Sequence, residues 1–134
     1  MIQSAEEFVK LRTSDVPEEY HRAMHETAPD EVWLEVIEKY PEKKKWVAHN
    51  KTVPLHILRL LAADPDPDVR MTVAATRRTE TDLLAQLAVD PDQLVRQAVV
   101  FNLKTPENVL RILAHDPWDR VAGKALDRLR RIKQ

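Results

Sequence analysis

The chain has 134 residues and a net charge of −1, and its 43% hydrophobic and 32% charged residues are typical of a globular domain rather than of a disordered chain. The absence of cysteine excludes disulfides, zinc–thiolate sites and cysteine-ligated iron–sulfur clusters, while a single glycine argues against tight β-hairpins. No apolar run approaches the roughly 20 residues that cross a bilayer, and the first residues lack the features of a signal peptide. We therefore expect one all-α cytoplasmic domain over residues 1–134, with no membrane contact.

Residues 1–38 are expected to form an acidic helical cap. They carry a net charge of −7, whereas residues 39–134 carry +6. Ser4 and Glu7 have the spacing of a capping box. Further helices are expected near Pro17 and Pro29, because proline fits the first turn of a helix.

The candidate chemistry of this segment is weak. His21 and His25 share one helix face, but Arg22 stands where a metalloprotease motif needs a glutamate, so a solvated face is the preferred interpretation. The only serines, Ser4 and Ser14, lie near the N-terminus, and one glycine cannot build a phosphate loop. We predict no catalytic residue, no metal site and no cofactor.

A ten-residue sequence recurs every 26 residues after the cap. It reads LAADPDPDVR from Leu61, LAVDPDQLVR from Leu87 and LAHDPWDRVA from Leu113. A fixed period of this size predicts stacked structural units, here over residues 39–126. Residues 127–134 are expected to close the stack as the basic end of a C-terminal helix.

Each repeat is expected to contain two helices. One apolar stripe consists of Leu83, Leu84, Leu87 and Ala88, and we assign it to a helix of about three turns. Val69 and Val73 form a shorter stripe, which we assign to a helix of about two turns. A two-helix unit of this size cannot bury its apolar face alone, so an α-solenoid (α/α superhelix) of about 26 residues per repeat is predicted.

The polar residues of the repeat are expected at helix ends. Asp66 and Asp92 are placed to cap the shorter helix, and Thr79 and Thr105 to cap the longer one. Asp-Pro ends the preceding helix, because proline disfavours helical geometry in the residue before it.

The aromatic residues receive separate predictions. Trp33 is expected to lie inside the cap, and Trp46 at the junction of the cap and the repeats. Phe101 is expected in the core, with a place at a binding interface as the weaker alternative. Trp118 stands where the other repeats have Asp66 and Asp92. It either shields the last repeat or serves as a binding anchor, a role that tryptophan often has at interfaces.

The segment LAADPDPDVRMTVAATRRTETDLLAQLAVDPDQLVRQAVVFNLKTPENVL resembles the leucine-rich repeat variant, a bacterial relative of HEAT-like α-helical repeats. The resemblance covers about residues 46–126 and implies an α-solenoid that binds proteins along its curved surface, or in a minority of members nucleic acid. It also implies a ladder of recurring Asp and Arg side chains, to which Arg70 and Arg96 correspond and which ends at Ala122. The iron–sulfur cluster of some members does not carry over, because this chain has no cysteine.

Two sets of residues are candidates for partner binding. Mixed charges on the longer helices suit a protein partner, and a row of basic residues after the shorter helices suits a phosphate backbone. The first set is His56, Arg59, Asp82, Asn108 and Arg111, with Trp118 as a candidate anchor. The second set is Lys51, Arg77, Arg78 and Lys104. We predict a non-catalytic protein–protein interaction module, in one version a small bacterial inhibitor or immunity-type protein, with nucleic-acid binding as the alternative.

Overall fold

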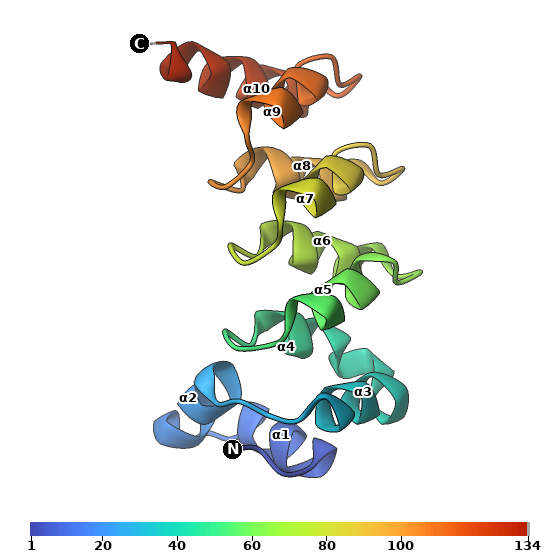
Figure 1. Cartoon of the computed structure of the whole chain (residues 1–134), viewed down its shortest axis with the longest axis vertical. Coiled ribbons are helices and arrows are strands. Elements are labelled where there is room, and N and C mark those ends of the chain that lie inside the picture. The colour runs from blue at the N-terminus through green and yellow to red at the C-terminus, as the bar shows by residue number, and fades with distance from the viewer. Residues whose placement is uncertain (134) are drawn as a thin grey trace. The chain divides into compact units, whose positions relative to one another are not determined.

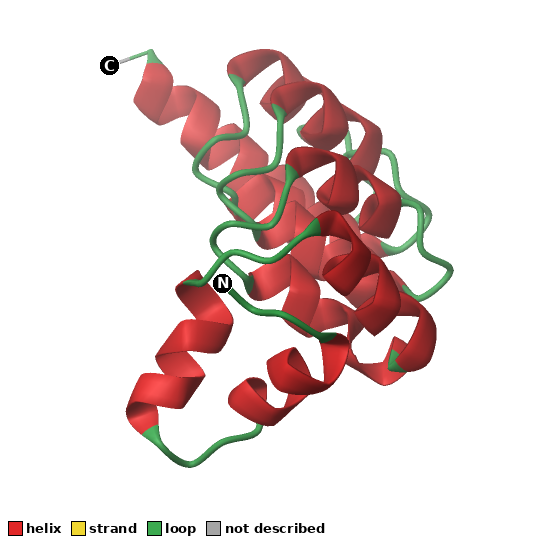
Figure 2. Ribbon diagram, turned by 60° about the horizontal axis from the view of Figure 1, so that its bottom comes forward, coloured by secondary structure: helices red, strands yellow, loops and turns green. Residues whose placement is uncertain are grey.

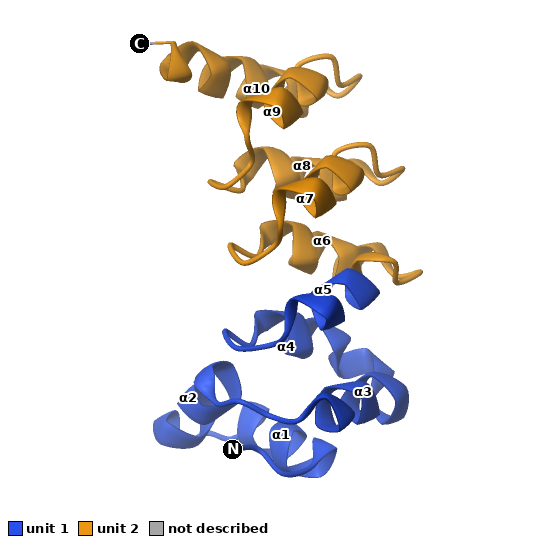
Figure 3. Ribbon diagram, viewed as in Figure 1, with its two compact units in different colours: residues 1–61 blue, residues 62–134 orange. Residues whose placement is uncertain are grey.

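The computed structural model describes residues 1–133, and every regular element among them is helical, which confirms the predicted all-α class. Figure 2 shows these helices joined by loops alone. The chain divides into two compact units, Met1–Leu61 (unit 1) and Ala62–Gln134 (unit 2), which Figure 3 distinguishes by colour.

Unit 1 holds the first helices of the chain. They are α1 (Ala5–Arg12), α2 (Pro17–His25), α3 (Asp30–Lys39), a 3-10 turn η1 (Pro41–Lys43), α4 (Lys44–His49) and α5 (Leu55–Ala62), whose last residue belongs to unit 2. Helix α1 packs against α2 and α3, and α3 packs against η1 and α4. Phe8 and Trp33 are fully buried and meet edge to face, with ring centroids 5.2 Å apart. The prediction that Trp33 lies inside this segment is confirmed.

The helix starts of unit 1 agree with the sequence. The Ser4 hydroxyl accepts a hydrogen bond from the Glu7 amide at 3.0 Å and caps α1. The Glu7 carboxylate accepts from the amide of Gln3, one residue earlier than in a standard capping box. Helix α2 begins at Pro17 and α3 follows Pro29 directly, as predicted.

Unit 2 contains the repeated sequence. Its helices are α6 (Pro67–Ala75), α7 (Thr81–Leu87), α8 (Gln93–Phe101), α9 (Glu107–Leu113) and α10 (Asp119–Ile132). Helix α6 packs beside α8, α8 packs beside α10, and α9 lies against α10 (Figure 1). Helices α6 and α8 have nine residues each, whereas α7 and α9 have seven.

The predicted helix lengths in these two pairs are therefore wrong. The apolar stripe of α6 begins at Val69, two residues after the helix starts at Pro67. In α7, the second helix of the repeat, the apolar stripe extends to Ala88, one residue past the end of the helix. A stripe records the buried face and not the full helix, because capped first turns are polar.

Aspartate caps begin α6 and α8, as predicted. The Asp66 carboxylate accepts a hydrogen bond from the amide of Asp68 at 2.9 Å, and the Asp92 carboxylate accepts from the amide of Leu94 at 2.7 Å. Each bond satisfies one of the amides that a helix N-terminus leaves without an internal partner.

The predicted threonine caps are wrong. The Thr79 hydroxyl donates to the Val73 carbonyl at 2.7 Å, and the Thr105 hydroxyl donates to the Val99 carbonyl at 2.6 Å. Both threonines are buried against the end of the preceding helix, where carbonyls lack helical partners. They close α6 and α8, while α7 and α9 begin without a side-chain cap.

An ion pair links successive parts of the repeat. The Arg70 Nε atom lies 2.9 Å from Asp90 Oδ2, and Arg96 Nε lies 2.6 Å from Asp116 Oδ2. All four side chains are largely buried. The pairing of recurring arginines and aspartates that the resemblance implies is present in unit 2.

Candidate binding surfaces

Recurring polar side chains of the chain bond to its own backbone. The Asn102 amide donates to the carbonyls of Ala74 and Thr76 at 2.8 and 3.0 Å, and its oxygen accepts from the amide of Lys104. In unit 1, Asn50 bonds in the same way to the Ala23 carbonyl and to nearby backbone groups. Both amide side chains thus have their hydrogen-bond partners within the fold.

The basic loop residues of unit 2 lie on one side of that unit. Arg77 and Arg78 follow α6, Lys104 follows α8, and Figure 1 shows these two loops on the same side as the C-terminal end of α10. Lys51 lies in the loop after α4, in unit 1, where its amide donates to the Met24 carbonyl. The structure thus brings three of the four predicted loop cations to one edge of unit 2.

Several candidates on the helix faces already have partners within the chain. The His56 Nε2 atom lies 2.7 Å from Asp30 Oδ2 in unit 1, and Arg111 lies 3.3 Å from Glu107 on α9. Asp82 and Asn108 are exposed in the first turns of α7 and α9, and Arg59 is half-buried on α5. His56 and Arg59 thus belong to unit 1, whereas Asp82, Asn108 and Arg111 belong to unit 2.

Trp118 holds the N-cap position of α10 without making a cap bond. The Asp116 carboxylate accepts a hydrogen bond from the Trp118 amide at 2.9 Å and so supports this turn. The indole is half-buried, with the Arg120 guanidinium 5.5 Å from its ring centroid.

Phe101 is not a core residue, and this prediction is wrong. The side chain is 52% exposed at the end of α8. The aligned residues Ala75 and His49 are also exposed. The position therefore points outward in each repeat, next to a buried residue such as Val100.

A hollow of about 360 Å³ lies between the end of α8 and one face of α10. Its lining residues combine apolar and basic side chains: Phe101, Leu103, Lys124, Arg128, Arg131 and Ile132. We call it the α8–α10 hollow. The sequence indicates that the C-terminal helix is basic, but it does not indicate that apolar side chains lie beside the basic ones. This surface forms only when α8 and α10 pack together.

Arg128 is a half-buried cation of the α8–α10 hollow. Its Nη1 atom donates to the carbonyls of Val100 and Asn102, each at 2.8 Å, and so closes the end of α8. Burial lowers the pKa of this guanidinium. Within residues 1–133 no carboxylate forms an ion pair with Arg128, whereas Arg131 lies 3.3 Å from Asp127.

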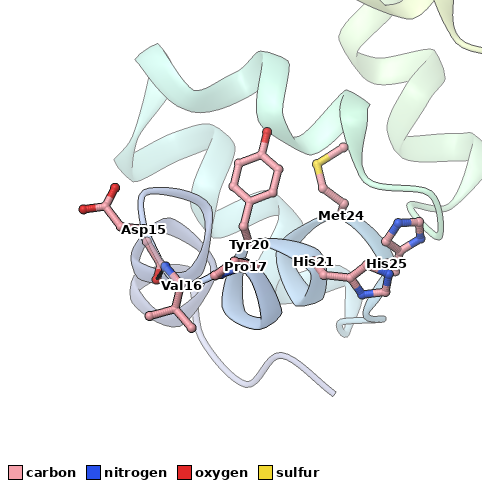
Figure 4. A pocket seen from close by; sticks show the side chains of 8 residues that line it. Asp15, Val16, Pro17, Tyr20, His21, Met24 and His25 are labelled. Atoms are coloured by element: carbon pink, nitrogen blue, oxygen red, sulfur yellow. Dashed lines mark hydrogen bonds between the residues drawn. The ribbon is translucent and has the colours of Figure 1, made fainter.

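A second hollow, of about 420 Å³, lies in unit 1 beside α2. Figure 4 shows Tyr20, Met24 and the two imidazoles of His21 and His25 around it. The two imidazoles are stacked, with centroids 4.1 Å apart. Across the described part of the chain, no three His, Cys, Asp or Glu side chains are grouped so as to hold a metal ion.

No helix of the described residues combines the length and the apolar character that a membrane crossing requires.

Comparison with known proteins gives no relative from which a function could be inferred. No family model, no curated protein and no solved structure matches this chain.

Proposed function

We propose that this chain is a non-catalytic binding module that recognises another protein through exposed side chains of unit 2. The observation that carries the proposal is a contrast between two groups of side chains in this unit. Its recurring polar side chains bond to one another or to backbone, as Asn102 and Arg70 do, while large apolar side chains such as Leu103 are exposed. Exposed apolar groups interspersed with charges are typical of protein interfaces.

The repetition of contacts supports a HEAT-like scaffold, which we propose as an α-solenoid of 26-residue units. Arg70 and Arg96 use the same atoms toward aspartates 20 residues later in the chain. In such arrays the outer side chains can vary while the inner contacts stay constant. A small bacterial inhibitor or immunity-type protein is one form that this function could take, and it predicts protection of cells against a co-encoded toxin.

The test is capture of proteins from a native extract by the tagged full chain, with and without nuclease treatment. We expect a protein to be retained in stoichiometric amount under both conditions, because the contacts involve side chains of both proteins. Retention that disappears after nuclease treatment would show that nucleic acid bridges the two and would overturn the proposal.

Nucleic-acid binding is the second candidate, and the shared edge of Arg77, Arg78 and Lys104 favours it. Such binding predicts affinity for duplex DNA or structured RNA that falls steeply as salt rises, since bound cations are released from the phosphates. Fluorescence anisotropy at low and near-physiological salt measures this directly.

A pair of charge-reversal variants separates the site from the net charge. Arg77→Glu with Arg78→Glu would abolish nucleic-acid binding, with an unchanged helical circular dichroism spectrum. Lys10→Glu with Lys45→Glu makes the same change of charge in unit 1 and would retain most of the binding. Equal binding by wild type and both variants would reject the basic loops as the site.

A further inference from the structure

We propose that the α8–α10 hollow binds an acidic segment of a partner protein that also carries apolar side chains. This inference rests on the proposed protein-binding function and adds the site and the chemistry of the partner.

The apolar side chains of the hollow are largely exposed among the described residues. Leu103 is 72% exposed, and Phe101 and Ile132 are each 52% exposed, although all three line the same concave surface. Concave apolar surfaces are where ligand side chains lose most contact with water. A volume of about 360 Å³ suits the side chains of a short peptide segment.

The excess of positive charge in the hollow favours an anionic partner. Lys124 and Arg131 share one carboxylate, that of Asp127, at 3.9 and 3.3 Å. Arg128 has backbone carbonyl partners but no ion pair within the described residues. Three cations therefore face one anion, and a partner carboxylate would complete the hydrogen bonding of groups that are already held in place.

The same residues favour a protein over a nucleic acid. Leu103 and Ile132 are aliphatic and gain nothing from a phosphate backbone. The Lys124 ammonium lies 5.3 Å from the Phe101 ring centroid and occupies a face on which a base would stack. An acidic peptide with leucine or phenylalanine side chains satisfies both the cations and the apolar groups.

The experiment measures fluorescence anisotropy of a labelled peptide in which Asp and Glu alternate with Leu and Phe. The comparison peptide has Asn and Gln at the acidic positions. We expect the acidic peptide to bind the full chain about tenfold more tightly, a difference of about 1.4 kcal/mol that shrinks as salt rises. Equal binding of the two peptides, or no binding of the acidic one, would overturn the proposal.

Substitutions then locate the peptide on the protein. Leu103→Ser with Arg131→Glu removes one apolar and one basic contact and leaves Arg128 in place to close α8. We expect about a tenfold loss of affinity for the acidic peptide with unchanged helical circular dichroism. Leu34→Ser with Lys45→Glu makes the same chemical changes at exposed sites of unit 1 and is expected to bind as wild type does.

Three further outcomes contradict the proposal. Polyglutamate that binds as tightly as the mixed peptide would mean that charge alone is recognised. Duplex DNA that displaces the peptide at lower concentration would assign the hollow to nucleic acid. The last outcome is that a native partner is captured equally by wild type and by the Leu103→Ser, Arg131→Glu variant. That result would reject the hollow as the binding site but leave the proposed protein-binding function intact.

Discussion

Arg70 and Asp90 form a two-point ion pair inside unit 2. The Arg70 Nε and Nη2 atoms donate to the two carboxylate oxygens of Asp90 at 2.9 and 3.1 Å, and the side chains are only 14% and 7% exposed. The third nitrogen of Arg70, Nη1, donates to the Asp64 carbonyl at 2.8 Å. Hydrogen bonding to Asp90 raises the pKa of the Arg70 guanidinium and so favours its charged form.

We predict that Arg70→Ala lowers the free energy of unfolding by about 2 to 3 kcal/mol. Loss of one member of a fully buried ion pair costs about 3 to 5 kcal/mol, and a surface pair contributes less than about 1, so this largely but not fully buried pair lies between. Urea unfolding followed by circular dichroism measures the loss. Arg77→Ala, at an exposed loop position, is expected to stay within about 0.5 kcal/mol of wild type. Equal effects of the two substitutions would show that the ion pair contributes no special stability.

Asn102 supports a second prediction, because its side chain holds two backbone segments of unit 2 together. Asn102→Ala removes the bonds of this side chain to Ala74, Thr76 and Lys104, and the Ala74 carbonyl loses a buried hydrogen bond. We expect a loss of about 2 to 3 kcal/mol in the free energy of unfolding, at about 1 kcal/mol for each lost bond. Asn108→Ala is the matched control, since Asn108 is exposed on α9, and it should cost less than about 0.5 kcal/mol. A loss below 1 kcal/mol for Asn102→Ala would mean that water replaces the amide.

The parts of the fold that the sequence predicted correctly are local or periodic. Asp66 and Asp92 precede helices at a fixed spacing, and a cap bond joins residues two apart. Arg70 and Arg96 recur with the period of the repeat. Thr79 and Thr105 were misassigned because hydroxyls both donate and accept, and only burial against the preceding helix decides which bond forms.

The α8–α10 hollow could not be predicted, because it depends on tertiary packing. Phe101 is the last residue of a nine-residue helix, where a short apolar pattern no longer defines the inner face. Leu103 lies in a loop, outside any periodic pattern. Arg128 is basic in the sequence, but only the structure shows that it closes α8 through the carbonyls of Val100 and Asn102.

The pH dependence of unit 1 provides a third prediction. Hydrogen bonding from Arg22 and from the Met1 amino group lowers the pKa of Glu26 from its ordinary value of 4.5 to about 2. A carboxylate with a lowered pKa in the folded state stabilises the protein above pH 4.5, and this contribution is lost as the pH falls toward 2. Because both partners are half exposed, we expect Glu26→Gln to lower the free energy of unfolding by on the order of 1 kcal/mol near neutral pH.

Urea titrations across the acid range test this expectation. Wild type and Glu26→Gln should differ near neutral pH and converge as the pH approaches 2, whereas Glu38→Gln, on the exposed end of α3, should follow wild type throughout. A constant difference between wild type and Glu26→Gln at every pH would assign the effect to packing and not to the charge.

Arg12 lies between two aromatic rings of unit 1 and supports the fourth prediction. Its guanidinium carbon is 4.7 Å from the ring centroids of both Tyr20 and Trp46, so it joins α1 to α2 and α4. Arg12→Ala removes two cation–π contacts and is expected to lower the free energy of unfolding by about 1 to 2 kcal/mol. Arg12→Lys should recover only part of this, because an ammonium lacks the planar face that stacks on both rings. The control Lys10→Ala, at an exposed position of α1, should change stability by less than about 0.5 kcal/mol. Urea unfolding followed by tryptophan fluorescence reports these changes, and full recovery by Arg12→Lys would show that charge alone, without stacking, holds the three helices.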